Sequence, residues 1–415
     1  MIKRYFYNLK NKNIILKEIE KLNDFNVAIS KDVINIINDI KQNGDRAIIK
    51  YEKLYDGVDL KEIKVNKKEI KNAYKKVDKN VLKAINLAIK NIRDFHKLQL
   101  KNLKGFVYKN NSYKIIQKYV PVDSAGIYIP GGQAPLFSTV IMAVIPAKVA
   151  GVKRIIITSP PKSNGSINPY ILVAADMLGV SEIYKIGGPM AIATMTYGTK
   201  TVPRVDKIAG PGNIYSTMAK KYVYGMVGID ALNGPSEITV FADESANPLF
   251  IAYDLLAQAE HINGHSLLIT TSKKLSDEIF RLLTDKNIKS DIMLVIVKNV
   301  NQAIEIINKK GPEHLEIISK NIDKILKNIK NAPAIFTGNF SPVAFGDYMA
   351  GANHILPTNG TSRFSSALSI FDFLKHTHIV NCSKETLKKF GIFVEKMAET
   401  EGLTAHAKSI EIRRK

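Results

Sequence analysis

Between Gly126 and Thr337, short runs of β-branched residues alternate with helical segments, and glycine turns separate many of them. The first series predicts strands at 127–129, 154–158, 182–186 and 205–208, with helices at 139–150, 169–178 and 191–197. Glycine turns lie at 130–132, 187–188 and 210–212, where the backbone can approach a phosphate at a helix N-terminus. Strand, turn and helix in repetition predict a parallel sheet with crossover helices.

The same alternation starts again at Ile238. Its expected strands are 238–242, 267–271, 293–297, 314–318 and 334–337, with helices near 248–261, 274–284, 301–309 and 320–329. We therefore predict an α/β fold with two similar Rossmann-like parallel-sheet halves, although no residue-level repeat relates them. Neither half carries G-x-G-x-x-G or a P-loop, so both are incomplete as nucleotide-binding units.

Helical periodicity is expected on either side of these halves. Residues 1–105 have apolar residues at helical spacing, for example Val33, Ile36, Ile37 and Ile40, and the tail from Lys384 is also helical. Residues 106–120 are polar and β-prone, which predicts a hairpin. The expected segments are 1–105, packing on the second half; 106–233, the first half; 234–375, the second half; and 376–415, the tail.

The formal net charge of +22 is unusual, whereas 45% hydrophobic and 24% charged residues are ordinary for a globular enzyme. Lysines are spread over amphipathic helices such as 67–104, and no alternation of aromatic and basic residues suggests stacking on bases. We interpret the charge as solvated helix faces and expect no nucleic-acid partner. A nucleotide cofactor would also benefit from a positive field.

No apolar run has the length of a membrane span, and the start MIKRYFYNLKNKNIILK is interrupted by lysine and asparagine, unlike a signal peptide. We therefore expect a cytoplasmic protein that does not bind membranes. The single cysteine, Cys382, excludes an internal disulfide and a CxxC metal or redox motif.

The segment from Asp230 to His265 contains the first candidate for chemistry. It begins with the turn 234–236 and continues into the expected helix 248–261, on which Asp254, Gln258 and His261 follow at spacings of four and three. Residues so spaced share one helix face. The stripe is either a surface pair satisfied by hydrogen bonds or half of a metal site.

Three polar segments are expected at the carboxyl ends of strands, where open parallel sheets bind ligands. They are 234–236, 311–314 and 346–354. Glu313 and His314 could move protons near neutral pH, or form a loop pair in ordinary hydrogen bonds. Asp347 could bond to its own backbone, and His354 could be a satisfied loop histidine.

Six motifs of this sequence resemble those of the histidinol dehydrogenase family and occur in the family's order from about residue 120 to the end. They are GIYIPGGQAPLFSTVIMAVIPAKVAGV, KIAGPGNIYSTMAKKYVYGMVGIDALNGPSEITVFAD, DLLAQAEH, GPEHLEI, GDYMAGANHILPTNGTSRFSSALSIFDFLK and EGLTAHA. The resemblance implies an architecture similar to that of aldehyde dehydrogenases. It also implies oxidation of L-histidinol to L-histidine with two NAD per turnover, through bound histidinaldehyde, as the last step of histidine biosynthesis.

The resemblance further implies one Zn²⁺ per subunit, which positions the substrate's imidazole and amine. Its ligands would be Gln258, His261, Asp347 and His406. His314 would take the alcohol proton, and Glu313 with His314 would activate water to attack the aldehyde. The zinc and proton-transfer residues would thus belong to the second half.

Substrate and cofactor contacts are also implied by the resemblance. The substrate would contact Ser236, His354 and Glu401, together with His314 and the zinc ligands. NAD would bind on the first half, at Tyr128, Asn213 and the position of Met190. Because the family's counterpart of His406 reaches across a dimer interface, the resemblance implies a homodimer with shared active sites.

Three positions depart from the family's pattern. Met190 stands where the family has a glutamine that hydrogen-bonds NAD, and methionine cannot donate a hydrogen bond. Val343 stands where a glutamate is usual, and residues 121–124 lack a common basic residue. None of these positions belongs to the zinc or proton-transfer set.

Two other functions are compatible with parts of the sequence. A related zinc and NAD enzyme acting on another small alcohol, such as sulfopropanediol, would keep the same machinery, although His354 and Glu401 favour histidinol. A basic nucleic-acid-binding protein on the same fold would have little physical reason to keep every donor of the proposed site.

Overall fold

The computed structural model describes residues 2–8, 10–21, 28–131, 135–261, 263–284, 286, 288 and 290–415. Gly132 of the predicted turn 130–132 lies outside them. The chain forms two compact units, Met1–Lys97 with Asp123–Phe373, and Leu98–Val122 with Leu374–Lys415. These units interleave along the chain and thus differ from the four consecutive segments that the sequence suggested.

The first half of the larger unit is a five-stranded parallel sheet in the order β6-β5-β4-β7-β8. Its strands are β4 (Ser124–Tyr128), β5 (Arg154–Ser159), β6 (Glu182–Lys185), β7 (Lys207–Ala209) and β8 (Gly228–Ile229). Its helices are α6 (Phe137–Ala150), α7 (Pro169–Met177), α8 (Gly188–Tyr197) and α9 (Ile214–Val223). Because α6 to α8 are apolar on nearly every side, most of their residues are buried in this half.

The second half is a six-stranded parallel sheet in the order β1-β11-β10-β9-β12-β13. Its strands are β1 (Ile2–Phe6), β9 (Glu237–Ala242), β10 (His265–Thr270), β11 (Asp291–Ile296), β12 (His314–Ile318) and β13 (Ala334–Thr337). The helices are α10 (Pro248–Ala259), α11 (Lys273–Thr284), α12 (Val300–Lys310) and α13 (Ile322–Leu326). Without β1, both sheets follow the strand order third, second, first, fourth, fifth. The prediction of two similar Rossmann-like halves is therefore confirmed.

The N-terminal region is less uniform than expected. Besides α1 (Lys12–Lys21), α2 (Lys31–Asn43), α3 (Asp45–Tyr55), α4 (Lys67–Tyr74) and α5 (Lys79–Asn102), it contains β1, which pairs with β11. Ile15 and Ile19 of α1 pack in the core of the second half. Ile37 and Ile48, from α2 and α3, pack instead against Ile192 of α8 in the first half. The predicted packing of 1–105 on the second half is thus wrong for α2, α3 and α4, because the apolar stripes of α2 and α3 belong to the core of the first half and α4 packs against α7.

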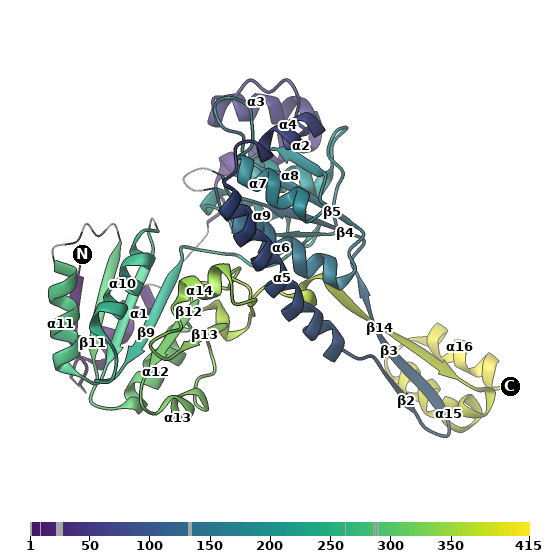
Figure 1. Cartoon of the computed structure of the whole chain (residues 1–415). Helices are drawn as coiled ribbons and strands as arrows, with labels where there is room; N and C mark the ends of the chain where they lie inside the picture. The colour runs from purple at the N-terminus through teal and green to yellow at the C-terminus, as the bar shows by residue number, and fades with distance from the viewer. Residues whose placement is uncertain are drawn as a thin grey trace. The chain divides into compact units, whose positions relative to one another are not determined.

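The smaller unit is an antiparallel ribbon with two helices beside it (Figure 1). Its strands β2 (Phe106–Lys109), β3 (Tyr113–Pro121) and β14 (Leu374–Cys382) pair in the order β14-β3-β2, and α15 (Lys384–Thr400) packs against α16 (Thr404–Arg414). The predicted hairpin and helical tail are confirmed. The sequence did not predict β14, whose alternation is masked by polar residues on an exposed strand.

The segment that follows β13 has little regular structure. It contains α14 (Val343–Tyr348), η1 (Thr361–Arg363) and η2 (Ile370–Phe373). It is held to the rest of the larger unit by hydrogen bonds, for example from Asn353 Nδ2 to the carbonyl of Met142 at 2.7 Å. Among the described residues, no helix combines the length and apolar character needed to span a membrane.

Candidate active site

The predicted proton-transfer pair lies where β12 begins. Helix α12 ends at Lys310, Gly311 takes the left-handed conformation that caps it (φ 57°), and after Pro312 and Glu313 the strand starts at His314. Glu313 and His314 are each only 5% exposed. This abrupt connection from helix to strand buries both side chains at the edge of the sheet.

The expectation that 234–236 and 311–314 lie at carboxyl ends of strands is wrong. Both segments precede their strands, β9 and β12, and so lie at the amino edge of the second sheet. The physical reason is the order along the chain, since the apolar runs that form these strands come after the polar residues and not before them.

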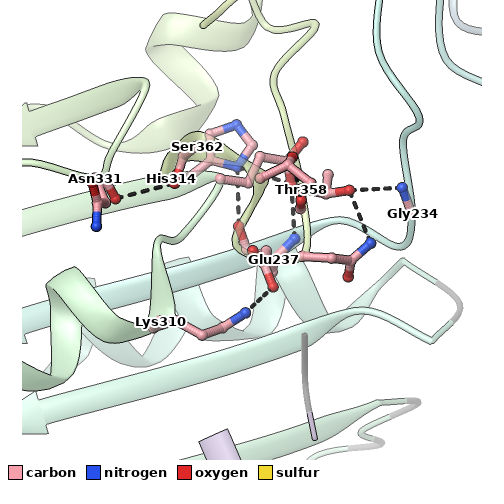
Figure 2. A network of polar contacts seen from close by, with 10 residues as sticks. Gly234, Glu237, Lys310, His314, Asn331, Thr358 and Ser362 are labelled. Atoms are coloured by element: carbon pink, nitrogen blue, oxygen red, sulfur yellow. Dashed lines mark hydrogen bonds and ion pairs between the residues drawn. The ribbon is translucent and has the colours of Figure 1, made fainter. Parts of the chain in front are cut away.

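The backbone of Glu237 contacts both members of the pair. Its N–H donates to Oε2 of Glu313 at 2.8 Å, and its carbonyl lies 3.2 Å from Nδ1 of His314, a contact that Figure 2 shows as a dashed line. A carbonyl can only accept, so Nδ1 of His314 must donate. In the neutral ring the lone pair then lies on Nε2.

The other ring nitrogen of His314 is available for chemistry. Nε2 is buried without a hydrogen-bond partner among the described residues, and it lies 3.5 Å from Oδ1 of Asp347. Burial alone lowers the pKa of His314, but the carboxylates of Glu313 and Asp347 outweigh it and raise that pKa well above its usual value. The two carboxylates therefore make this imidazole a stronger base than an isolated histidine.

Asp347 and His354 are brought to the same place. Asp347 lies in the short helix α14, and its carbonyl accepts a hydrogen bond from Nδ1 of His354 at 2.9 Å. Nε2 of His354 is 3.3 Å from the hydroxyl of Thr139. Burial lowers the pKa of His354, so the ring is held neutral between these two partners. Three of the predicted residues, Asp347, His314 and His354, thus form one cluster.

Gln258 and His261 are arranged differently from the predicted helical stripe. Helix α10 ends at Ala259, so the predicted end at 261 is wrong, and His261 follows the helix in a turn in which Asn263 has a positive φ of 58°. Gln258 is 6% exposed, and its Nε2 has no hydrogen-bond partner in the described parts of the chain. His261 is exposed, and its N–H donates to the carbonyl of Gln258 at 3.1 Å.

These residues fit a zinc ion by their chemistry. Gln258 has a buried amide, whose oxygen would be the donor, His261 has an exposed imidazole, and Asp347 has a carboxylate that is 31% exposed. Zinc binds oxygen and nitrogen donors of these kinds. The fourth predicted ligand, His406, is exposed on α16 in the smaller unit, as is Glu401 just before that helix. Within the described residues, His, Cys, Asp and Glu alone form no group of three suited to a metal, so a metal here would also need the amide of Gln258.

Glu316, which the sequence did not single out, lies on the same face of β12 as His314, two residues further along. Its Oε1 accepts a hydrogen bond from the N–H of Val343 at 3.0 Å, which anchors the start of α14. Burial, and then the neighbouring Asp254, raise the pKa of Glu316 to about 8, while burial raises the pKa of Asp254 to about 6. The alternation of His314 and Glu316 in the strand was the available signal.

The predicted cofactor residues Tyr128 and Asn213 lie at the carboxyl ends of strands in the first sheet, whereas Glu313 and His314 lie at the amino edge of the second sheet. Tyr128 ends β4, and its hydroxyl accepts from the N–H of Gly188 at 3.2 Å. Asn213 follows β7 and caps α9 through a 3.0 Å hydrogen bond from Ser216. Met190 is only 2% exposed and belongs to the hydrophobic core of this half.

Glu52, which the sequence did not single out, holds the glycine turn at this edge of the first sheet. Glu52 of α3 is fully buried, and its Oε1 accepts from the N–H of Gly187 at 2.8 Å, directly before α8. Burial is the main cause that raises the pKa of Glu52 to about 8. No pattern in the N-terminal sequence indicated that its one buried glutamate contacts a turn more than a hundred residues away.

Comparisons with known proteins agree on one family. The family model described as Histidinol dehydrogenase matches residues 20–414. The chain is 47% identical to the histidinol dehydrogenase of Clostridium acetobutylicum, covering 99% of this chain and 96% of that one. It is 44% identical to that of Methanocaldococcus jannaschii, covering 98% of each.

A solved structure leads to the same conclusion. The crystal structure of histidinol dehydrogenase from Elizabethkingia anophelis matches with a TM-score of 0.90 and 36% sequence identity, covering 99% of this chain and 97% of that chain. The agreement thus extends over nearly the full length in both sequence and fold. The chain belongs to the histidinol dehydrogenase family.

Proposed function

We propose that this enzyme oxidises L-histidinol to L-histidine in two NAD-dependent steps through histidinaldehyde. Besides the family, one observation carries the proposal. His314 has Nδ1 held by a backbone carbonyl and Nε2 without a partner, and the Glu313 carboxylate lies 3.5 Å from the same ring. A buried imidazole and carboxylate in this arrangement can act as a general acid–base pair.

In the first step, Nε2 of His314 takes the proton of the primary alcohol while the hydride leaves the same carbon, which gives histidinaldehyde. In the second step, Glu313 with His314 removes a proton from water as its oxygen adds to the aldehyde carbon. Loss of a second hydride from the resulting hydrate gives the carboxylate of histidine. The Glu237 backbone holds both side chains in the orientation that these transfers need.

The residues that would hold the cofactor follow from the first sheet. NAD, when bound, accepts the hydride in each step. Tyr128 and Asn213 would contact it at the carboxyl edge, next to the glycine turn at 187–188. Met190 would contribute only packing, since it is buried in the core and cannot donate a hydrogen bond.

The residues that would hold a metal are Gln258, His261 and Asp347 of one subunit with His406. Zinc, when bound, holds the imidazole and amine of the substrate in place. Ser236, His354 and Glu401 would contact the substrate beside it. Because the family's counterpart of His406 reaches across a dimer interface, we propose that a homodimer assembles each site from both subunits.

The test follows NADH formation from L-histidinol and NAD before chelation, after chelation and after zinc is restored. We expect turnover that chelation abolishes and zinc restores. Sulfopropanediol serves as a parallel substrate. Turnover of sulfopropanediol without turnover of histidinol would overturn the proposal, as would no turnover of histidinol by the zinc-loaded, NAD-binding enzyme.

A further inference from the structure

Lys310 and Glu237 form a buried ion pair outside the proposed catalytic and metal-binding residues. Each side chain is 1% exposed, and Nζ of Lys310 contacts Oε2 of Glu237 (Figure 2). The other carboxylate oxygen, Oε1, is buried without a hydrogen-bond partner in the described parts of the chain. Burying two charges is costly, and an apolar pair of similar size often stabilises a fold as well or better. Stability alone therefore gives no reason for these two residues.

The position of Glu237 suggests the reason. It is the first residue of β9, and its N–H and carbonyl are the two groups that bind Glu313 and His314. On the β12 side, the ladder of the sheet pairs Ile238 with His314 and does not include Glu237. The side chain of Glu237 thus makes the additional connection to the chain that carries the catalytic pair.

Lys310 completes this connection from the other direction. It is the last residue of α12, and only Gly311 and Pro312 separate it from Glu313. A Cβ at Gly311 would lie 2.8 Å from Oγ of Ser362, so this short turn is tightly enclosed. The ion pair therefore closes a small ring that runs from Lys310 through the turn to Glu313 and His314, and back through Glu237.

We propose that Lys310 and Glu237 are positioning residues that hold the Glu237 backbone against both catalytic side chains. In this arrangement the neutral His314 ring carries its proton on Nδ1 and presents Nε2 to the substrate, while Glu313 keeps its orientation for water. The inference rests on the proposed function for its catalytic consequence. The effect on the tautomer of the His314 ring does not depend on the proposed function.

The first experiment compares Lys310→Met, the double variant Lys310→Met with Glu237→Gln, and Leu283→Ala. Leu283 is fully buried in the second half and lies in none of the proposed sites, so its truncation is a control for loss of stability. Lys310→Met leaves a buried carboxylate unpaired and is expected to fold poorly, whereas the double variant removes both charges and folds.

We expect the double variant to recover thermal stability and yet to lose kcat by about ten- to a hundredfold with an unchanged KM for histidinol, because small misplacement of catalytic groups has effects of this size. Leu283→Ala should lose stability and keep kcat within about twofold. A double variant with both wild-type stability and wild-type kcat would overturn the proposal. So would a loss of kcat in Leu283→Ala equal to that of the double variant.

The second readout is independent of turnover. With ¹⁵N-labelled histidine at a pH where His314 is neutral, its signals, assigned through His314→Asn, should show the Nδ1–H tautomer in the wild type. A mixture of tautomers is expected in the double variant. An unchanged tautomer would overturn the proposal. If the wild type failed to oxidise histidinol, the proposed function would fall, while this spectrum would still decide whether the ion pair holds the ring.

Discussion

Glu313 and His314 are adjacent in sequence, and both are held by the backbone of a single residue, Glu237. Its N–H binds Glu313 and its carbonyl binds His314. As a result, one carboxylate oxygen of Glu313 is hydrogen-bonded, and Nε2 is the nitrogen of His314 that is left for chemistry. Both residues could be predicted from the sequence, because a Glu-His pair before an apolar run is visible in the sequence alone. It could not find Glu237 or Lys310, because their contribution depends on backbone contacts between strands.

At the same scale, His261 tests the proposed metal site. We expect His261→Ala to lower zinc affinity by at least about tenfold, since even residues that only support ligands have effects of this size. Because His261 is exposed, thermal stability of the metal-free protein should hardly change. Zinc per subunit after dialysis, measured by elemental analysis, is the readout.

The matched control is His378→Asn. His378 is an exposed histidine whose Nε2 contacts Gln117 at 2.9 Å and which belongs to none of the proposed sites. It should retain the wild-type zinc content. Equal zinc content in both variants would remove His261 from the proposed ligands.

At the scale of elements, Glu316 couples β12 to α14. Its folded-state pKa of about 8 lies above the ordinary value of 4.5, so the fold binds a proton that the unfolded chain releases. The stability that this group contributes is complete below about pH 4.5 and is lost as the pH rises toward about 8. We therefore expect the wild-type Tm to fall between pH 6 and pH 9 more steeply than that of Glu316→Gln, as measured by calorimetry.

Asp277→Asn provides the comparison for this experiment. Asp277 forms partly exposed ion pairs with Arg4 and Lys273, and these lower its pKa, so it does not titrate in that pH range. Its Tm should have the wild-type slope. If Glu316→Gln had that slope too, the titration of Glu316 would not account for the pH dependence of the Tm.

Glu52 is the corresponding connection on the cofactor side. We expect Glu52→Leu, which keeps the site buried but removes the acceptor of the Gly187 N–H, to raise the KM for NAD by about two- to tenfold, the equivalent of one hydrogen bond. The KM for histidinol should stay constant. Glu62→Gln, at an exposed position of the same region, should change neither constant. An unchanged KM for NAD in Glu52→Leu would separate α3 from cofactor binding.

Most elements of the two halves could be predicted, because alternating apolar runs and glycine turns are local signals. The predictions that were wrong concern contacts between elements that are far apart in the sequence. The stripe of α2 is visible in sequence, but its partner α8 is not, so the prediction places α2, α3 and α4 on the wrong half. The prediction of the sheet edge at which Glu313 lies is also wrong. Polar residues show where a strand ends, but they do not show whether that end is the amino or the carboxyl end.

At the scale of the whole molecule, the proposed sites draw on two compact units, and His406 belongs to the smaller one. No periodicity or spacing indicated this residue; only the resemblance to the family did. If each site takes His406 from the partner subunit, His406→Asn and His314→Asn subunits should complement each other. After mixing and reassembly, half of the dimers are mixed and each has one intact site, so about a quarter of wild-type activity is expected.

The readout is NADH formation before and after reassembly of the two inactive variants. Each variant reassembled with itself serves as the control and should stay inactive. Absence of any regained activity, with mixed dimers present by mass spectrometry, would mean that His406 acts within its own subunit or not at all.

The most direct test of the account is the number of NADH molecules formed per molecule of L-histidinol when the enzyme is in excess over L-histidinol. The wild type should form two. Glu313→Gln should form one, because its imidazole can still take the alcohol proton while water activation is lost, and His314→Asn should form almost none. Two NADH per histidinol in Glu313→Gln, or full activity in His314→Asn, would contradict the assignment of the two oxidation steps to this pair.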